Sequence, residues 1–154
     1  MKTLLITAAL LMFSATTFAK STQTELGSYL NYQDNVEIEA SRLALAESAK
    51  PSILDYAKRV EANHVNANLV LSTLARAEGL SLTKSGKFDK ELQQLKTLRG
   101  QAFDDAYKTL MICIHEEALA AIDSSVSLIA TPVGAFSQVI RTRVADGLDK
   151  AMNL

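Results

Sequence analysis

The sequence has 154 residues, 48% of them hydrophobic, and its 16 Lys and Arg against 17 Asp and Glu give a formal net charge of −1. That length suits one domain with enough chain to bury a core. No basic patch stands out, so the sequence predicts neither nucleic-acid binding nor attachment to an anionic membrane surface, because both partners attract dense positive charge.

The first 19 residues have the layout of a secretory signal peptide. Lys2 supplies the positive start, an apolar run from Leu4 to Phe13 follows, and the small residues Thr17 and Ala19 precede the expected cut after Ala19. The apolar run is about half the roughly 20 residues that a transmembrane helix needs. We therefore expect a periplasmic or secreted protein with no transmembrane span in the mature chain, residues 20–154, which forms one helical-bundle domain.

The mature chain is predicted to be helical, because apolar residues recur at steps of three and four rather than two. A first helix is expected over residues 24–49 and a second over residues 52–78, with Pro51 between them. Gly79 is expected to cap the second helix.

A polar connection over residues 80–87 leads to a short helix predicted at 88–98. A third long helix is expected over 101–130, and a fourth begins after Thr131 and Pro132, a cap residue followed by proline at the first helical position. The pattern predicts an all-α four-helix bundle with a short extra helix between the second and third helices. The long connection suits the single crossover of ferritin-like folds, but periodicity does not choose between that and an up-and-down bundle.

Four polar residues lie on or beside the apolar stripes of these helices, namely Glu37, His64, His115 and Glu117. A carboxylate buried in a bundle must be neutralised, paired or bound to metal. Glu37, His64 and His115 are therefore candidate ligands for iron, zinc or manganese, the metals that suit carboxylate and imidazole. The simpler interpretation is structural: His64 as a hydrogen-bonded core histidine, and Glu37 as the buried partner of His64 or Arg143.

Glu61 and His64 form a Glu-x-x-His pair, which places both on one helix face. Di-iron bundles carry that pair on two helices, and here the fourth helix has no histidine. Glu61 and Glu117 are therefore weaker candidate ligands. No phosphate-binding loop or nucleophile elbow is present, which favours a role without catalysis.

Cys113 is the only cysteine, so no internal disulfide can form. Its apolar sequence neighbours predict a buried, inert thiol.

Several segments together resemble one bacterial family, known as domain of unknown function 4142, also labelled a predicted outer membrane protein and grouped with ferritin-like folds. The resemblance rests on Glu37–Ala44, Tyr56–Val60 with Asn63 and His64, Asn68–Leu71, Leu98–Tyr107 followed by His115, and Leu148–Leu154. It implies a ferritin-like bundle outside the cytoplasm with no assigned activity, and it marks Glu37, His64 and His115 as recurring polar positions.

Two positions depart from the family pattern. Asn63 stands where the family usually has Asp, and Gly147 stands where it usually has a histidine on the last helix. If the histidines form a metal site, this chain lacks one ligand, and the site is either open to water or inactive.

Three functions remain open. The first is an exported bundle with a non-catalytic binding or structural role in the cell envelope. The second is a metal-binding protein for iron handling or peroxide chemistry, using Glu37, His64 and His115. The third is a helix-mediated oligomer or envelope-stress partner. It predicts an exposed second apolar line on the third helix, formed by Met111, Ile112, Leu119, Ile122 and Ile129.

Overall fold

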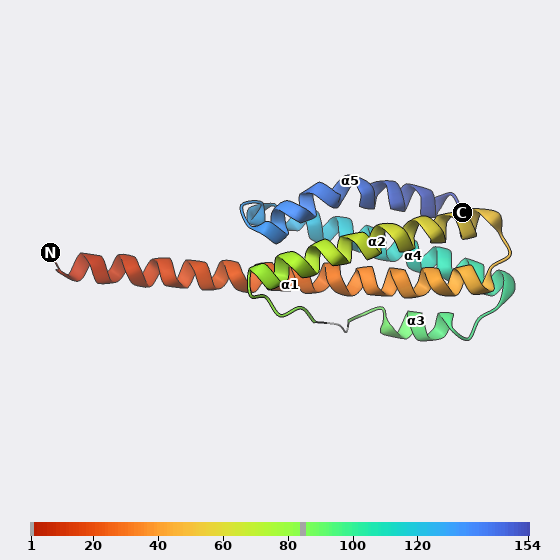
Figure 1. Cartoon of the computed structure of the whole chain (residues 1–154), viewed down its shortest axis with the longest axis horizontal. Helices are drawn as coiled ribbons and strands as arrows, with labels where there is room; N and C mark the ends of the chain where they lie inside the picture. Colours follow the sequence, from red (N-terminus) through yellow and green to blue (C-terminus); the bar gives the residue numbers. More distant parts are fainter. Residues whose placement is uncertain (1, 84–85) are drawn as a thin grey trace.

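The computed structural model describes residues 2–83 and 86–154, with side chains from residue 20 onward (Figure 1). The side chains of the expected signal peptide, residues 1–19, therefore lie outside the described part. The elements are α1 (Lys2–Glu47), α2 (Pro51–Ala77), α3 (Asp89–Leu95), α4 (Gly100–Ser124), the 3₁₀ turn η1 (Val126–Leu128) and α5 (Pro132–Met152). The all-α prediction is confirmed, because these elements include no strand within the described ranges.

The four long helices form two antiparallel hairpins, α1 with α2 and α4 with α5 (Figure 1). The connection from α2 to α4 runs the whole length of the bundle and carries α3 along its side. Its start, Leu80, belongs to the apolar cluster of Leu26 near the α4–α5 turn, whereas Leu95 belongs to the cluster of Phe103 toward the opposite end. The structure thus selects the single crossover of ferritin-like bundles, with α2 and α4 parallel.

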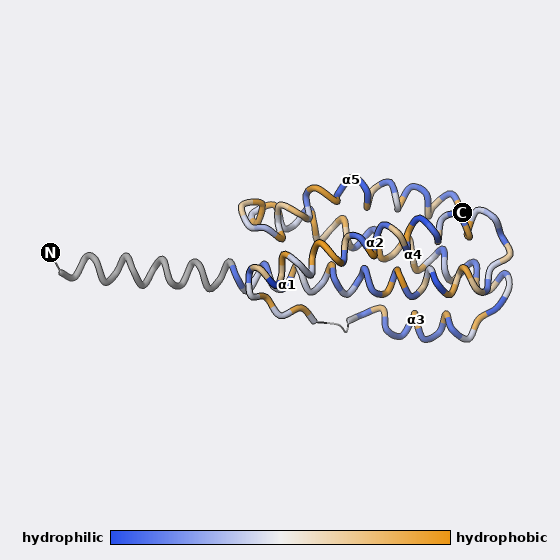
Figure 2. Tube along the Cα trace, in the orientation of Figure 1, coloured by the Kyte–Doolittle hydropathy of each residue, from blue (hydrophilic) through white to orange (hydrophobic). Residues whose placement is uncertain are grey.

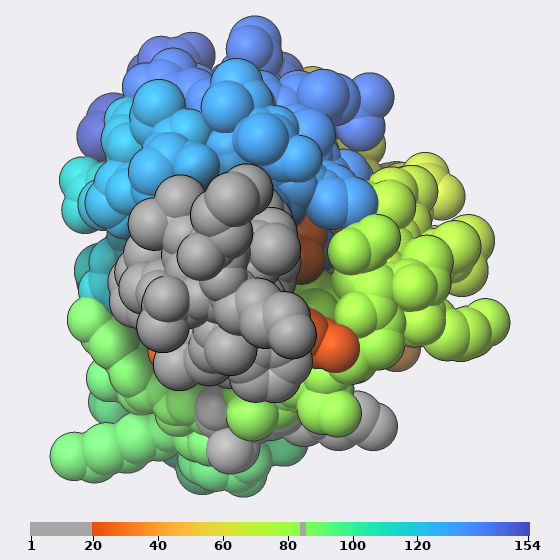
Figure 3. Space-filling model, turned by 90° about the vertical axis from the view of Figure 1, so that its left-hand side faces the viewer, coloured from red at the N-terminus to blue at the C-terminus, as the bar shows by residue number. Residues whose placement is uncertain are grey.

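The helix ends follow the predicted capping chemistry. Gly79 has φ +62°, a conformation that favours glycine, and the Leu80 N–H donates to the Ala75 carbonyl at 2.8 Å. At α5, the Thr131 hydroxyl accepts from the Gly134 N–H at 3.1 Å, and proline follows the cap. Figure 3 views the end of the bundle where the α4–α5 turn lies beside the last turn of α2.

The predicted third helix is too long. It was expected to reach residue 130, but α4 ends at Ser124 and gives way to η1. The Ser124 hydroxyl donates to the Ala121 carbonyl at 2.9 Å and the Ser125 hydroxyl to the Ile122 carbonyl at 2.8 Å. Such side-chain bonds compete with the helical ladder and explain the early stop. The short helix expected over 88–98 is likewise trimmed to Asp89–Leu95.

The core consists of two apolar clusters placed one after the other along the bundle. The first cluster lies toward the α1–α2 loop and includes Ala40, Val60, Phe103, Ile114 and Ala151. The second cluster lies toward the α4–α5 turn and includes Leu30, Leu71, Ala118, Val133 and Val144. Figure 2 shows the alternation of hydrophobic and hydrophilic positions along the helices that feed these clusters.

The second apolar line predicted on the third helix is not an exposed patch. Met111 and Ile122 are fully buried and Ile112 and Leu119 are half-buried, because α1, α3 and α5 all pack on α4; only Ile129 remains open, at 57% exposure. The prediction of a buried Cys113 is also wrong, since the thiol is exposed. Apolar neighbours in sequence lie about 100° apart around a helix, so they do not share one face. In the described part of the chain, no helix is long and apolar enough to cross a membrane.

Candidate metal centre

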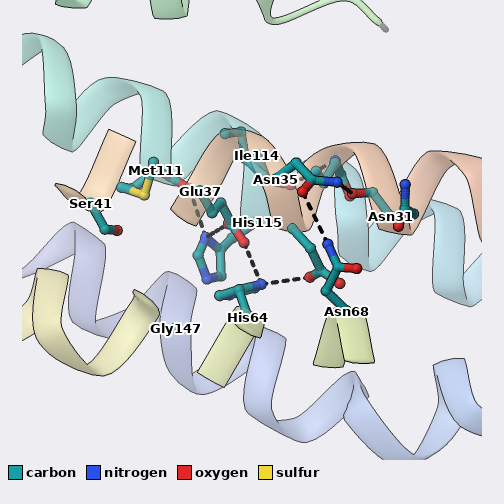
Figure 4. Close-up of polar contacts among 12 residues, drawn as sticks. Asn31, Asn35, Glu37, Ser41, His64, Asn68, Met111, Ile114, His115 and Gly147 are labelled. Carbon is teal, nitrogen blue, oxygen red and sulfur yellow. Dashed lines mark hydrogen bonds and ion pairs between the residues drawn. The ribbon is translucent and has the colours of Figure 1, made fainter. Parts of the chain in front are cut away.

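The structure brings Glu37, His64 and His115 together in the middle of the bundle (Figure 4). They come from α1, α2 and α4, and one ligand atom of each lies within 4.8 Å of the other two. Glu37 and His115 are each only 2% exposed, while His64 is partly open. The separation that would have excluded a shared site, more than about 10 Å, is not found.

These residues occupy one level of the bundle, between the two apolar clusters. On α1, Glu37 lies between Leu30 of the second cluster and Ala40 of the first. On α4, His115 lies between Ile114 and Ala118 in the same way. The helical period that turns the apolar residues inward therefore turns these polar residues inward as well.

The Glu37 carboxylate bridges the two imidazoles. Its Oε2 lies 2.7 Å from His64 Nδ1, and its Oε1 lies 3.0 Å from His115 Nδ1. His115 Nδ1 also lies 2.8 Å from the Met111 carbonyl oxygen. Since both neighbours of that nitrogen are acceptors, Nδ1 donates, while Nε2 of His115 points toward Gly147.

Asp34 is a member of this cluster that the sequence analysis missed. Its Oδ1 lies 2.7 Å from His64 Nδ1, and its side chain is buried. A signal for it was present, because Asp34 precedes Glu37 by three residues and so shares its helix face.

Burial and the neighbouring charges have opposite effects on the pKa values of the side chains in this cluster. Burial raises the pKa of Glu37, but the positive charges of His64 and His115 outweigh it and hold that pKa below its ordinary value. Burial lowers the pKa of His64, yet the carboxylates of Glu37 and Asp34 raise it to about 10. Burial raises the pKa of Asp34 to about 6 despite its bond to His64. In the metal-free protein, a charged imidazole thus compensates the buried negative charge.

The fourth long helix, α5, contributes no ligand to the cluster, because Gly147 has no side chain. A Cβ atom at Gly147 would lie 2.2 Å from Nε2 of His115, so the imidazole occupies the room that any side chain there would need. The Tyr56 hydroxyl donates to the Gly147 carbonyl at 3.2 Å and fixes α2 against α5 here. A cavity of about 60 Å³ is lined by all three candidate ligands and by Gly147. That volume exceeds the roughly 10–15 Å³ needed for one water.

The two weaker candidate ligands lie elsewhere. Glu61 pairs with Arg42 at 2.7 Å on the outer surface. Glu117 pairs with Lys87 and lies 3.4 Å from the Tyr29 hydroxyl, on the side of the crossover connection. Neither belongs to the cluster of Glu37, His64 and His115. The expected partner of Glu37 is His64; no ion pair of Glu37 with Arg143 is found among the described residues.

A family model described as "Domain of unknown function (DUF4142)" matches residues 11–154. The chain belongs to the DUF4142 family. The match covers almost the whole sequence and confirms the resemblance seen in the sequence segments. Both departures from the family pattern in this DUF4142 chain, Asn63 and Gly147, line the same cavity.

Among solved structures, the chain is similar to the crystal structure of a DUF305 fragment from Deinococcus radiodurans, with a TM-score of 0.74. The two share 11% identity, and the alignment covers 86% of this chain and 93% of the other. At that identity the likeness establishes the helical fold alone. No curated protein matches the DUF4142 chain.

Proposed function

We propose that this protein binds a divalent transition-metal ion through Glu37, His64 and His115. The observation that carries the proposal is the convergence of one ligand atom from each residue within 4.8 Å. Ligands about 2.1 Å from a tetrahedral metal lie roughly 3.4 Å from one another. Side-chain movements that bring these atoms to such distances would close the cluster around an ion.

The donor set supports iron, zinc or manganese. Two imidazoles and one carboxylate are typical ligands of zinc sites with an open position and of non-haem iron sites. The groups that hold these ligands are also present. The Met111 carbonyl orients His115, and the Asp34 carboxylate orients His64. Such outer partners fix the ring orientation in known metal sites.

Because the metal-free cluster carries a proton, metal binding should release it. His64 Nδ1 carries a proton shared between Glu37 and Asp34. An ion takes over the role of that positive charge, so loading at neutral pH releases a proton from the cluster.

We further propose that the protein works outside the cytoplasm, as an exported binding protein of the cell envelope without catalysis. The signal-peptide layout of residues 1–19 supports export. A bundle whose buried ligands come from separate helices supports retention of an ion, because each ligand is held by packing on a rigid element.

The first experiment is elemental mass spectrometry of the untagged protein purified from the periplasm. Near-stoichiometric iron, zinc or manganese is expected, with at least tenfold less in His64→Ala and Glu37→Gln. Glu61→Gln is the matched control, since Glu61 lies outside the cluster and pairs with Arg42. Absence of metal from the wild type, including after reloading, would contradict the proposal and leave the cluster as a structural ion-pair network.

A further inference from the structure

The cavity at the candidate metal centre opens to solvent between α2 and α5. Its deep lining residues are buried, whereas its exposed or half-exposed lining residues form a mouth. The mouth residues are Arg59 and Asn63 from α2 and Arg143, Asp146 and Lys150 from α5.

The mouth carries uncompensated positive charge. Lys150 forms an ion pair with Asp146. Within the described residues, neither Arg59 nor Arg143 forms an ion pair, whereas Arg42 and Arg141 on other surfaces pair with Glu61 and Asp123. Two arginines without an ion-pair partner among the described residues thus line the mouth of one small cavity, whose inner wall carries the Asp34 and Glu37 carboxylates and His64.

The charge of Arg59 acts on the inner wall of the cavity. Burial raises the pKa of Tyr56, and the positive charge of Arg59 opposes that rise. The Tyr56 hydroxyl bonds to the Gly147 carbonyl beside His115. Arg59 and Tyr56 line the same cavity as the metal ligands.

We infer that the protein holds its metal together with a small oxyanion, of the bicarbonate or phosphate class. Arg59 and Arg143 attract the oxyanion, which occupies the cavity of about 60 Å³ that they and the candidate metal ligands line. Arginine suits this role because its planar fork matches oxyanion geometry. This inference rests on the proposed metal site.

The test uses the full mature chain loaded with Co²⁺, whose visible spectrum reports a change of ligand. Bicarbonate and phosphate are titrated separately at constant ionic strength, with chloride as the reference anion. We expect a saturable spectral change with at least one oxyanion and none with chloride at the same concentration. The oxyanion that saturates the spectral change at the lower concentration is the preferred ligand.

Variants distinguish oxyanion binding that depends on the two arginines from oxyanion binding to the metal alone. Arg59→Ala and Arg143→Ala are each expected to weaken oxyanion binding about tenfold, with Co²⁺ affinity unchanged within a factor of two or so. Arg76→Ala is the matched control, because Arg76 is exposed on α2 and does not line the cavity. Circular dichroism of each variant confirms that the bundle is folded.

The outcomes are distinct. A Co²⁺ spectrum that does not respond to either oxyanion overturns this inference and leaves the metal site intact. An equal response in wild type and in both arginine variants overturns it too, since the metal alone would then bind the anion. Failure of the wild type to bind Co²⁺ overturns both the metal site and the oxyanion.

Discussion

Glu37 keeps a charged carboxylate in the core because it has a hydrogen-bonded nitrogen at each oxygen. Removing a charge from water costs several kcal/mol, which is recovered only where partners and geometry are good. Asp34 adds a second carboxylate, and His64 supplies the compensating charge. At the scale of the residue, the cluster is thus a charge-balanced unit whose members depend on one another.

The metal-free protein should lose stability as the pH rises above neutral. The pKa of His64 is raised to about 10 in the fold, against about 6.5 in an unfolded chain, so the folded state binds more protons between these values. The stabilisation is complete below about pH 6.5 and is lost as the pH approaches 10. Asp34, whose pKa is raised from 3.8 to about 6, acts in the same sense, but at lower pH, between these two values.

Urea unfolding in the presence of a chelator at pH 6.5, 8 and 9.5 measures this slope, which can reach about 1.4 kcal/mol per pH unit. His64→Gln should flatten it. A wild-type free energy of unfolding that is level across the window would contradict the assignment of the charge to His64.

Gly147 should be required by His115. Gly147→Ala places a Cβ 2.2 Å from His115 Nε2, and the clash should lower the free energy of unfolding by about 1–3 kcal/mol despite the better helix propensity of alanine. In a His115→Ala background the same substitution should be neutral or stabilising. The double-mutant cycle, measured by urea unfolding, isolates this coupling. Additive effects of the two substitutions would show that the imidazole does not fill the space at Gly147.

At the scale of the element, the crossover connection is held by side chains of α1. The Tyr32 hydroxyl accepts from the Phe88 N–H at 2.7 Å and lies 3.0 Å from Asp89 Oδ1. Burial, together with the bond to Asp89, raises the pKa of Tyr32 to about 12, so the hydroxyl stays protonated and serves both bonds. One phenol thus fixes the start of α3 to the first hairpin.

Tyr32→Phe should loosen the crossover connection. It leaves the buried Phe88 N–H without its acceptor, at a cost of about 1–3 kcal/mol. Native-state proteolysis should show faster cleavage within residues 80–88, while the helical circular dichroism of the bundle stays unchanged. Cleavage at the wild-type rate would mean that other contacts hold this segment.

At the scale of the whole molecule, the polar cluster of Glu37, His64 and His115 lies where the two apolar clusters meet. The clusters stabilise the bundle on either side, so the central level can carry groups that cost stability. Export would place this centre where metal ions and small anions arrive from outside the cell. That location rests on residues 1–19 and is a proposal with its own test.

Processing of the chain should follow the sequence pattern at Ala19. Intact mass spectrometry of the protein recovered from the periplasm should give a mature chain that starts at Lys20. Ala19→Leu removes the small residue that cleavage needs and should leave the precursor uncleaved. Recovery of only the full-length chain from wild-type cells would contradict the signal-peptide prediction.

The sequence alone determined the order of the helices, their caps and the inward placement of Glu37 and His64, because these depend on local periodicity and on residues such as Gly79 and Thr131. It placed His115 only beside the apolar stripe, whereas the structure buries it. It could not determine the crossover, because both bundle topologies bury the same stripes. It missed Asp34 and wrongly buried Cys113, because the helices that pack around α1 and α4 decide which of their side chains are covered. Only the tertiary structure decided that three helices bring their polar residues to one level and that the fourth leaves a space at Gly147, because distances between separate helices are set by packing.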